Sequence, residues 1–129
     1  MRRLALVLAL TAACASEGGP LPPKAPPPPP KEASPAEIAR GQNLFQGLER
    51  LKNGGPACNS CHHVKNDAVI GGGVLAKELT TVFSTMGTPG INAILGKPPF
   101  PVMAAAYAEH PLTDDESAAL VGFLHSRGE

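Results

Sequence analysis

Five consecutive residues, Cys58-Asn59-Ser60-Cys61-His62, constrain this chain more than any other stretch of it. Two thiols three positions apart match the two vinyl groups on one edge of a porphyrin, so each can form a thioether bond. A histidine directly after the second cysteine is then carried under the ring, where its imidazole can bind the iron. The motif therefore predicts one covalently attached haem, with Cys58 and Cys61 as attachment residues and His62 as an iron ligand.

Three other interpretations of a Cys-x-x-Cys pair are weaker in this sequence. Half of a zinc site would need a second pair of ligands, but the third cysteine, Cys14, lies near the N-terminus and the four histidines form no finger-like pair. A thioredoxin-type redox pair is typical of βαβ surroundings, and no alternating strand and helix pattern is visible. A structural disulfide across two residues would leave His62 unexplained.

Residues 1–13 have the features of a bacterial signal peptide. A short basic region precedes an apolar run that is too short to cross a bilayer as a helix. The segment 10–14, LTAAC, resembles a lipobox, in which Cys14 is acylated and becomes the mature N-terminus, although Thr11 stands where leucine is usual. Ordinary cleavage that removes residues 1–15 is the alternative. Both predict a chain exported from the cytoplasm.

Residues 14–33 form the predicted linker, which contains the proline run Pro26–Pro30. Proline at this density excludes helix and sheet and favours extended polyproline II, with a rise of about 3.1 Å per residue. At that rise the segment could hold a domain up to roughly 50 Å from an anchor. A stiff spacer directly after a lipid anchor is the simplest interpretation.

Residues 34–129 are the predicted folded domain. Such a domain is marginal on its own apolar burial, and this one has no tryptophan, one tyrosine and four phenylalanines. A covalently held haem would supply the missing core. The whole chain carries 11 basic and 11 acidic side chains, and loss of the signal peptide removes Arg2 and Arg3, so the mature chain is mildly acidic. This charge argues against binding to nucleic acid.

A capping box at residues 34–37, Ser-Pro-Ala-Glu, predicts the start of a first helix, with proline at the first helical position. Asn53-Gly54 predicts its end. Three- and four-residue spacing places apolar residues and one glycine on a single face. This face consists of Ile38, Gly41, Leu44, Phe45, Leu48 and Leu51.

A second capping box at residues 113–116, Thr-Asp-Asp-Glu, predicts a last helix that ends before Gly128. Its buried face is predicted to consist of Leu120, Val121, Phe123 and Leu124. Thr88-Pro89 could start a short helix through Leu95 that ends at Gly96. No strand pattern is strong enough to predict a sheet, so the expected class is all-α.

These elements, in this order, resemble a class I c-type cytochrome over residues 34–129. The resemblance is carried by Gly41-x-x-x-Phe45 in the first helix, the Cys58–His62 motif, a methionine in a proline-rich segment, and a final helix with Phe123. It implies a small fold of three to five helices around one haem c. It also implies that the terminal helices cross near Gly41 and Phe123.

The chain departs from the family pattern after the haem motif. Residues 71–75, Gly-Gly-Gly-Val-Leu, stand where Gly-Pro-x-Leu is common. In the family, a carbonyl of this stretch accepts a hydrogen bond from the proximal histidine. The resemblance therefore implies that a glycine carbonyl within 71–75 holds His62 Nδ1.

The sixth iron ligand has several candidates. Met103 lies in a predicted loop, residues 98–103, whose prolines restrict the backbone. It precedes the last helix, as methionine ligands do in similar cytochromes, so it is the leading candidate. Met86 is expected to fill the core instead. His110 would give bis-histidine ligation, whereas His63 adjoins the proximal ligand and cannot easily reach the opposite face.

The resemblance implies a monohaem carrier of single electrons and not an enzyme. The expected location is the periplasmic side of the cytoplasmic membrane, by a lipid on Cys14, or a soluble periplasmic location if the signal is cleaved ordinarily. Expected partners are a quinol-oxidising complex, a terminal oxidase or a membrane-associated oxidoreductase. A fixed haem subunit of a larger complex, or a sensor or catalyst with an open iron site, remain alternatives.

Overall fold

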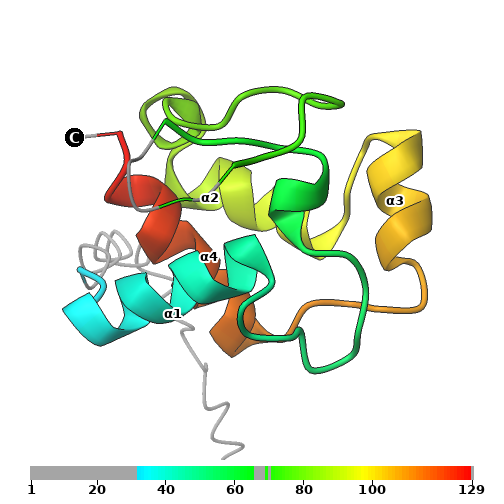
Figure 1. The fold of residues 1–129 in the computed structure, drawn as a ribbon, viewed down its shortest axis with the longest axis horizontal. Coiled ribbons are helices and arrows are strands. Elements are labelled where there is room, and N and C mark those ends of the chain that lie inside the picture. Colours follow the sequence, from blue (N-terminus) through cyan, green and yellow to red (C-terminus); the bar gives the residue numbers. More distant parts are fainter. Residues whose placement is uncertain (1–31, 66–68, 70, 129) are drawn as a thin grey trace, which may run out of the picture.

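The computed structural model describes residues 32–65, 69 and 71–128. This part of the chain contains four α-helices, one 3₁₀ turn and no strand, which confirms the all-α class (Figure 1). The elements in chain order are α1 (Pro35–Gln46), η1 (Cys58–Ser60), α2 (Val82–Gly96), α3 (Pro101–Tyr107) and α4 (Asp114–His125).

Both predicted capping boxes are formed, and they begin α1 and α4. The Ser34 hydroxyl accepts a hydrogen bond from the Glu37 amide at 3.3 Å, and the Glu37 carboxylate accepts one from the Ser34 amide at 2.8 Å. Thr113 and Glu116 repeat this exchange at 3.3 and 2.9 Å. Each pair satisfies amides that a helix N-terminus leaves without an internal partner.

The first helix ends earlier than predicted, so the predicted stop at Asn53-Gly54 is wrong. Gly47 adopts a left-handed conformation with φ of 76°, and its amide turns back to the carbonyls of Asn43 and Leu44. Glycine adopts this conformation without steric cost, which makes it a strong helix terminator. Leu48 therefore lies outside the helix and is 74% exposed, contrary to its predicted place on the buried face.

The terminal helices cross at Gly41, where the backbones of α1 and α4 come close together (Figure 1). A Cβ on Gly41 would overlap the carbonyl oxygen of Ala119 and lie 2.8 Å from Phe123 Cβ. The rings of Phe45 and Phe123 meet beside the crossing, with centroids 5.3 Å apart. The predicted crossing near Gly41 and Phe123 is confirmed.

The middle of the chain is more helical than predicted. The predicted helix from Thr88 is the second half of α2, which is kinked at Gly87 and begins at Val82. The segment expected to hold Met103 in a loop forms the short helix α3 instead. Pro101 occupies its first turn, where the missing amide hydrogen costs nothing.

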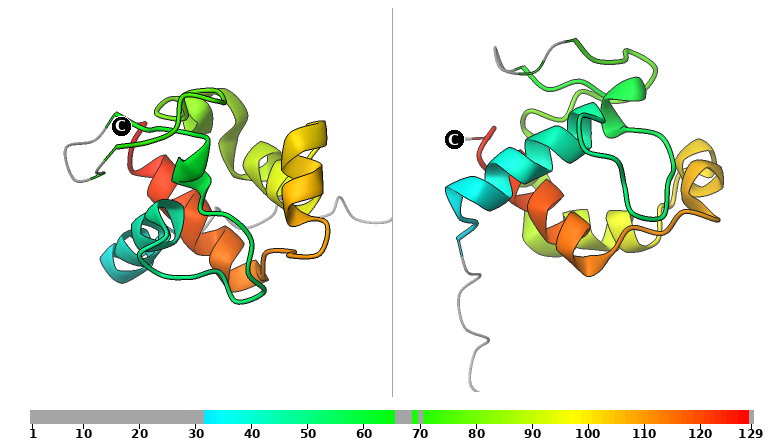
Figure 2. Two further views of the ribbon diagram at one scale, coloured as in Figure 1. Left: turned by 45° about the vertical axis from the view of Figure 1, so that its right-hand side comes forward. Right: turned by 60° about the horizontal axis from the view of Figure 1, so that its bottom comes forward.

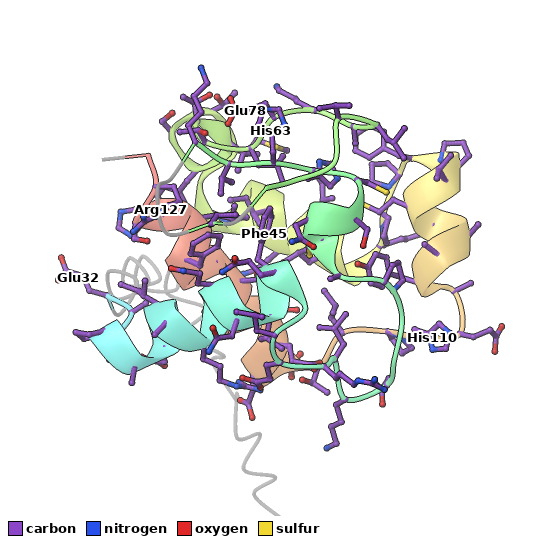
Figure 3. All side chains as sticks on the ribbon, in the orientation of Figure 1. Glu32, Phe45, His63, Glu78, His110 and Arg127 are labelled. Atoms are coloured by element: carbon purple, nitrogen blue, oxygen red, sulfur yellow. The ribbon has the colours of Figure 1, made fainter. Side chains whose placement is uncertain are left out.

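The core lies between α1, α4 and the second half of α2, and Phe45 occupies its centre in Figure 3. Every view places α3 at the end of the molecule remote from the C-terminus (Figure 2). The buried apolar residues are Leu44, Phe45, Leu51, Val64, Val69, Ile91, Ala119, Leu120, Val121, Phe123 and Leu124. Within the described ranges, no helix has the length and apolar character needed to cross a membrane.

Candidate functional site

The cysteine and histidine motif folds into one tight turn. The carbonyl of Cys58 accepts hydrogen bonds from the amides of Cys61 at 3.2 Å and His62 at 2.9 Å, and η1 occupies the first three residues. Both cysteine side chains are half-buried and neither forms a disulfide. The three predicted site residues therefore come together on a single turn of backbone.

His62 is held by a main-chain oxygen. Its Nδ1 atom lies 2.7 Å from the carbonyl oxygen of Lys77. A carbonyl can only accept, so Nδ1 carries the hydrogen, and Nε2 is left with the lone pair that a metal would take. The expectation of a glycine carbonyl within 71–75 is wrong, because the chain makes a longer excursion before it returns to the histidine.

That excursion packs directly on the motif turn. Three main-chain hydrogen bonds connect the two segments, so the position of the Lys77 carbonyl is fixed by backbone alone. These bonds run from Gly73 to Asn59 at 2.7 Å, from Ala76 to Cys61 at 3.0 Å and from Leu79 to His63 at 2.9 Å.

Two glycines make this close packing possible, and their role was not predicted. A Cβ on Gly72 would lie 2.5 Å from His63 Cβ, and a Cβ on Gly73 would overlap the carbonyl oxygen of Ser60. No other residue fits at either position without displacing the loop. The run of three glycines directly after the motif was the available signal, because consecutive glycines often mark a close approach of two backbones.

The surroundings of Cys58 do not suit thiol redox chemistry. Burial raises the pKa of its thiol to about 11, despite a hydrogen bond with Tyr107 that acts in the opposite direction. Burial also raises the pKa of the Tyr107 hydroxyl. Reactive thiols of the thioredoxin type have lowered pKa values, because the thiolate is the nucleophile. This environment therefore argues against a dithiol redox pair.

Tyr107 joins α3 to the motif. Its hydroxyl donates a hydrogen bond of 2.7 Å to the carbonyl of Pro56, two residues before Cys58. Met103 lies four residues before Tyr107 on α3, which places both on one face of the helix. Met103 is half-buried. The helix that carries the leading candidate for the sixth ligand is thus attached beside the haem motif by that same face.

The other two candidates have different surroundings. Met86 is 39% exposed and lies just before the kink of α2, so its expected place in the core is wrong. His110 packs beside Gly54, and its Nδ1 lies 2.6 Å from the carbonyl of Asn53, at the lower edge of the molecule in Figure 3. His110 thus has a structural partner that explains its position. Cys14 lies outside the described residues.

His63, which follows the proximal candidate, is the one described residue with a buried side-chain polar atom that lacks a hydrogen-bond partner, its Nδ1. It lies near Glu78 (Figure 3), whose pKa is lowered chiefly by a hydrogen bond from Thr80 and to a small degree by His63. No sequence signal identified this atom.

The donors present fit a haem better than a metal ion held by side chains alone. In the part of the chain that the structure describes, no three His, Cys, Asp or Glu residues gather closely enough to hold a metal. A haem iron needs only two axial protein ligands, since the porphyrin supplies the rest. Large apolar side chains on the loop after the motif and around Met103 are more than half exposed. They are Val74, Leu75, Phe100 and Val102.

Comparisons with protein-family models, with curated proteins and with solved structures found no match to this chain.

Proposed function

We propose that this chain is a monohaem electron carrier of the class I c-type cytochrome kind. The observation that supports it most is the arrangement of His62, whose Nδ1 faces the Lys77 carbonyl and whose Nε2 is free for a metal. The same turn carries two cysteines three positions apart, the sequence spacing that suits thioether bonds to the two vinyl groups of a porphyrin. When bound, the haem would supply reversible one-electron exchange between ferric and ferrous iron.

Each site residue has one role in this proposal. Cys58 and Cys61 would form the thioethers, and His62 and Met103 would bind the iron. A thioether favours the electron-rich ferrous form relative to a second imidazole, so Met103 sets a higher reduction potential than His110 would. No bond of a substrate is made or broken, so the protein is not an enzyme.

The proposed location is the outer side of the bacterial cytoplasmic membrane, with Cys14 as the lipid attachment site and the proline-rich residues 14–33 as a tether. A tethered haem domain can move between a donor and an acceptor in one membrane assembly. The proposed partners are a quinol-oxidising complex, a terminal oxidase or a membrane-associated oxidoreductase. Contacts of this kind use small, short-lived interfaces.

The deciding experiment is covalent haem retention. The full chain should be produced in a bacterial host that exports it and attaches haem to c-type cytochromes, and then denatured under conditions that strip non-covalent haem. We expect one haem to stay on the wild-type chain, and Cys58→Ala and Cys61→Ala to give poor yield with an altered pyridine haemochrome spectrum. Asn59→Ala is the matched control, because Asn59 contributes its main-chain carbonyl to the loop contact. Haem that washes out of the denatured wild type contradicts the proposal.

A further inference from the structure

Three hydrogen bonds, here called the clasp, join the segment before the motif, residues 53–56, to the segment at the end of α3, residues 107–111. The partners are more than 50 positions apart in the sequence, so the clasp is a tertiary contact. Its bonds run from the Tyr107 hydroxyl to the Pro56 carbonyl (2.7 Å), from His110 Nδ1 to the Asn53 carbonyl (2.6 Å) and from the Asn53 side-chain amide to the Pro111 carbonyl (2.6 Å).

The two segments are also tightly packed. A Cβ on Gly55 would lie 3.2 Å from His110 Cβ and 3.4 Å from the Tyr107 ring, and a Cβ on Gly54 would lie 3.2 Å from His110 Nδ1. The backbone φ is 83° at Gly54 and 94° at Gly55, so this turn favours glycine on conformational grounds as well. The two segments joined by the clasp therefore lie so close together that a side chain at Gly54 or Gly55 has little room.

The clasp is important for α3 because that helix has little other support. Among the described elements, α1 packs on α4 and η1, and α2 packs on α4, whereas no other helix approaches the backbone of α3 closely. None of the residues of α3 is fully buried. The position of the helix relative to Cys58 is thus set largely by Tyr107 and the residues that follow it.

We propose that the clasp positions Met103 for the iron, with Tyr107 as the main positioning residue. This inference rests on the proposed function, since it assumes that Met103 is the distal ligand. Tyr107 anchors the last turn of α3 beside the motif, and Met103 lies one turn earlier on the same face. Without this anchor the helix can move away from the motif. The Met103 sulfur is then held less firmly on the iron.

Imidazole is a direct probe of that hold, because it competes with the methionine sulfur for ferric iron. Tyr107→Phe in the full-length haem protein removes the hydroxyl and keeps the ring. We expect it to raise the apparent imidazole affinity roughly two- to tenfold, the range that corresponds to one intramolecular hydrogen bond. Asn53→Ala removes the bond to Pro111 and keeps the Asn53 carbonyl, so it should act in the same direction.

Ser126→Ala is the matched control. It removes a hydrogen bond of the same length, 2.7 Å from the Ser126 hydroxyl to the Phe123 carbonyl, at the far end of α4. It also removes the longer bond, of 3.1 Å, that this hydroxyl accepts from Arg127 Nε. We expect no change in imidazole affinity for this variant, even if its unfolding midpoint in urea falls. This separates a positioning role from a general loss of stability.

The outcomes distinguish the two proposals. If both clasp variants bind imidazole with wild-type affinity, or if the control shows an equal increase, the positioning role of the clasp is overturned. The proposal of an electron carrier is unaffected by either result. A wild-type protein that binds haem covalently but lacks the methionine–iron band also overturns the positioning role of the clasp, because Met103 then does not coordinate the iron. A chain without covalent haem contradicts both.

Discussion

Met103 and Met86 carry the same thioether in different surroundings. Met103 is half-buried on the face of α3 that Tyr107 attaches to the motif segment, whereas Met86 is 39% exposed beside a helix kink. A sulfur that coordinates iron changes the electronic states of the metal, and a sulfur that packs changes only stability. The two residues can therefore be separated by spectroscopy.

We predict that Met103→Ala keeps its covalent haem but loses the methionine–iron charge-transfer band of the ferric protein. Its reduction potential should fall, and the reduced form should bind carbon monoxide. Met86→Ala should keep the band and lose well under the roughly 2–5 kcal/mol that removal of a fully buried methionine costs. The reverse pattern would assign the ligand to Met86, and a wild type that never shows the band would favour His110.

Glu116 is a carboxylate in the core, with only 1% of its surface exposed. Burial alone would raise its pKa, but this effect is outweighed by hydrogen bonds from the amides of Lys52 and Thr113 and from the Thr113 hydroxyl, with help from Arg40. The net pKa is lowered. The Lys52 bond, at 2.7 Å, also connects α4 to the chain beyond α1.

A lowered pKa in the folded state means that ionised Glu116 stabilises the fold at neutral pH. This contribution is complete above the unfolded pKa, near ~4.3, and is lost as the pH falls through the lower folded value. We predict that Glu116→Gln lowers the free energy of unfolding by about 1–3 kcal/mol at pH 7. The difference in the free energy of unfolding between this variant and the wild type should narrow toward pH 3, as measured by urea titrations followed by circular dichroism. A difference that is independent of pH contradicts this role.

The crossing of α1 and α4 organises the molecule. The two helices touch at Gly41, where the carbonyl of Ala119 fills the space that a side chain would need. Interiors packed to this density cannot absorb an extra methyl group without moving backbone. The crossing is therefore sensitive to the smallest substitution.

We predict that Gly41→Ala costs about 3 kcal/mol or more, at the upper end of overpacking effects, because the clash is with backbone. Gly96→Ala is the control: its Cβ would meet nothing within 4 Å, and its φ is not positive. That change should be neutral or stabilise by up to about 1 kcal/mol. Thermal and urea unfolding of both variants measure the difference; equal stabilities would show that the helices separate freely.

The sequence predicted the elements that begin with a specific chemical signal. Both capping boxes were recognised from their side chains, and a costly glycine on an apolar face predicted the crossing at Gly41. The end of α1 was missed because Leu51 continues the helical spacing and is buried, yet the chain reaches it by a turn after Gly47. The first half of α2 was missed because its N-cap residue, Thr81, makes no side-chain capping bond.

The candidate site divides in the same way. Cys58, Cys61 and His62 follow from local spacing, which a sequence displays directly. The partners of His62 and Tyr107 are the main-chain carbonyls of Lys77 and Pro56. Every residue has such a carbonyl, so the residue type does not show which one will accept the hydrogen bond. Their roles depend on how the loops return, which no residue type encodes.

The predicted lipid attachment site and the Cys58–His62 motif lie far apart in the sequence. Cys14 and most of the predicted linker lie outside the described residues. The predicted lipid attachment and the predicted haem attachment therefore use different residues of one chain. Removal of one should leave the other intact.

We predict that Cys14→Ala moves the protein from the membrane fraction to the soluble fraction without a change in its visible spectrum. The spectrum should persist because the change leaves Cys58, Cys61, His62 and Met103 in place. Fractionation and mass spectrometry of the mature N-terminus provide the measurement, and Cys61→Ala, which should stay with the membrane, is the converse control. A wild-type N-terminus at Ser16 would instead favour ordinary signal cleavage and a soluble carrier.

The hydrogen bond between His62 and the Lys77 carbonyl has a consequence for how this protein can vary. The partner is a main-chain oxygen, so the side chain of residue 77 does not set the orientation of the imidazole. The orientation depends on the length of the chain between the two residues, which are 15 positions apart. Many side chains can be exchanged at residue 77 while the ring stays in place, but an insertion or deletion in the interval would rotate it. Substitution of residue 77 is therefore inexpensive, whereas a change in the length of the interval is not.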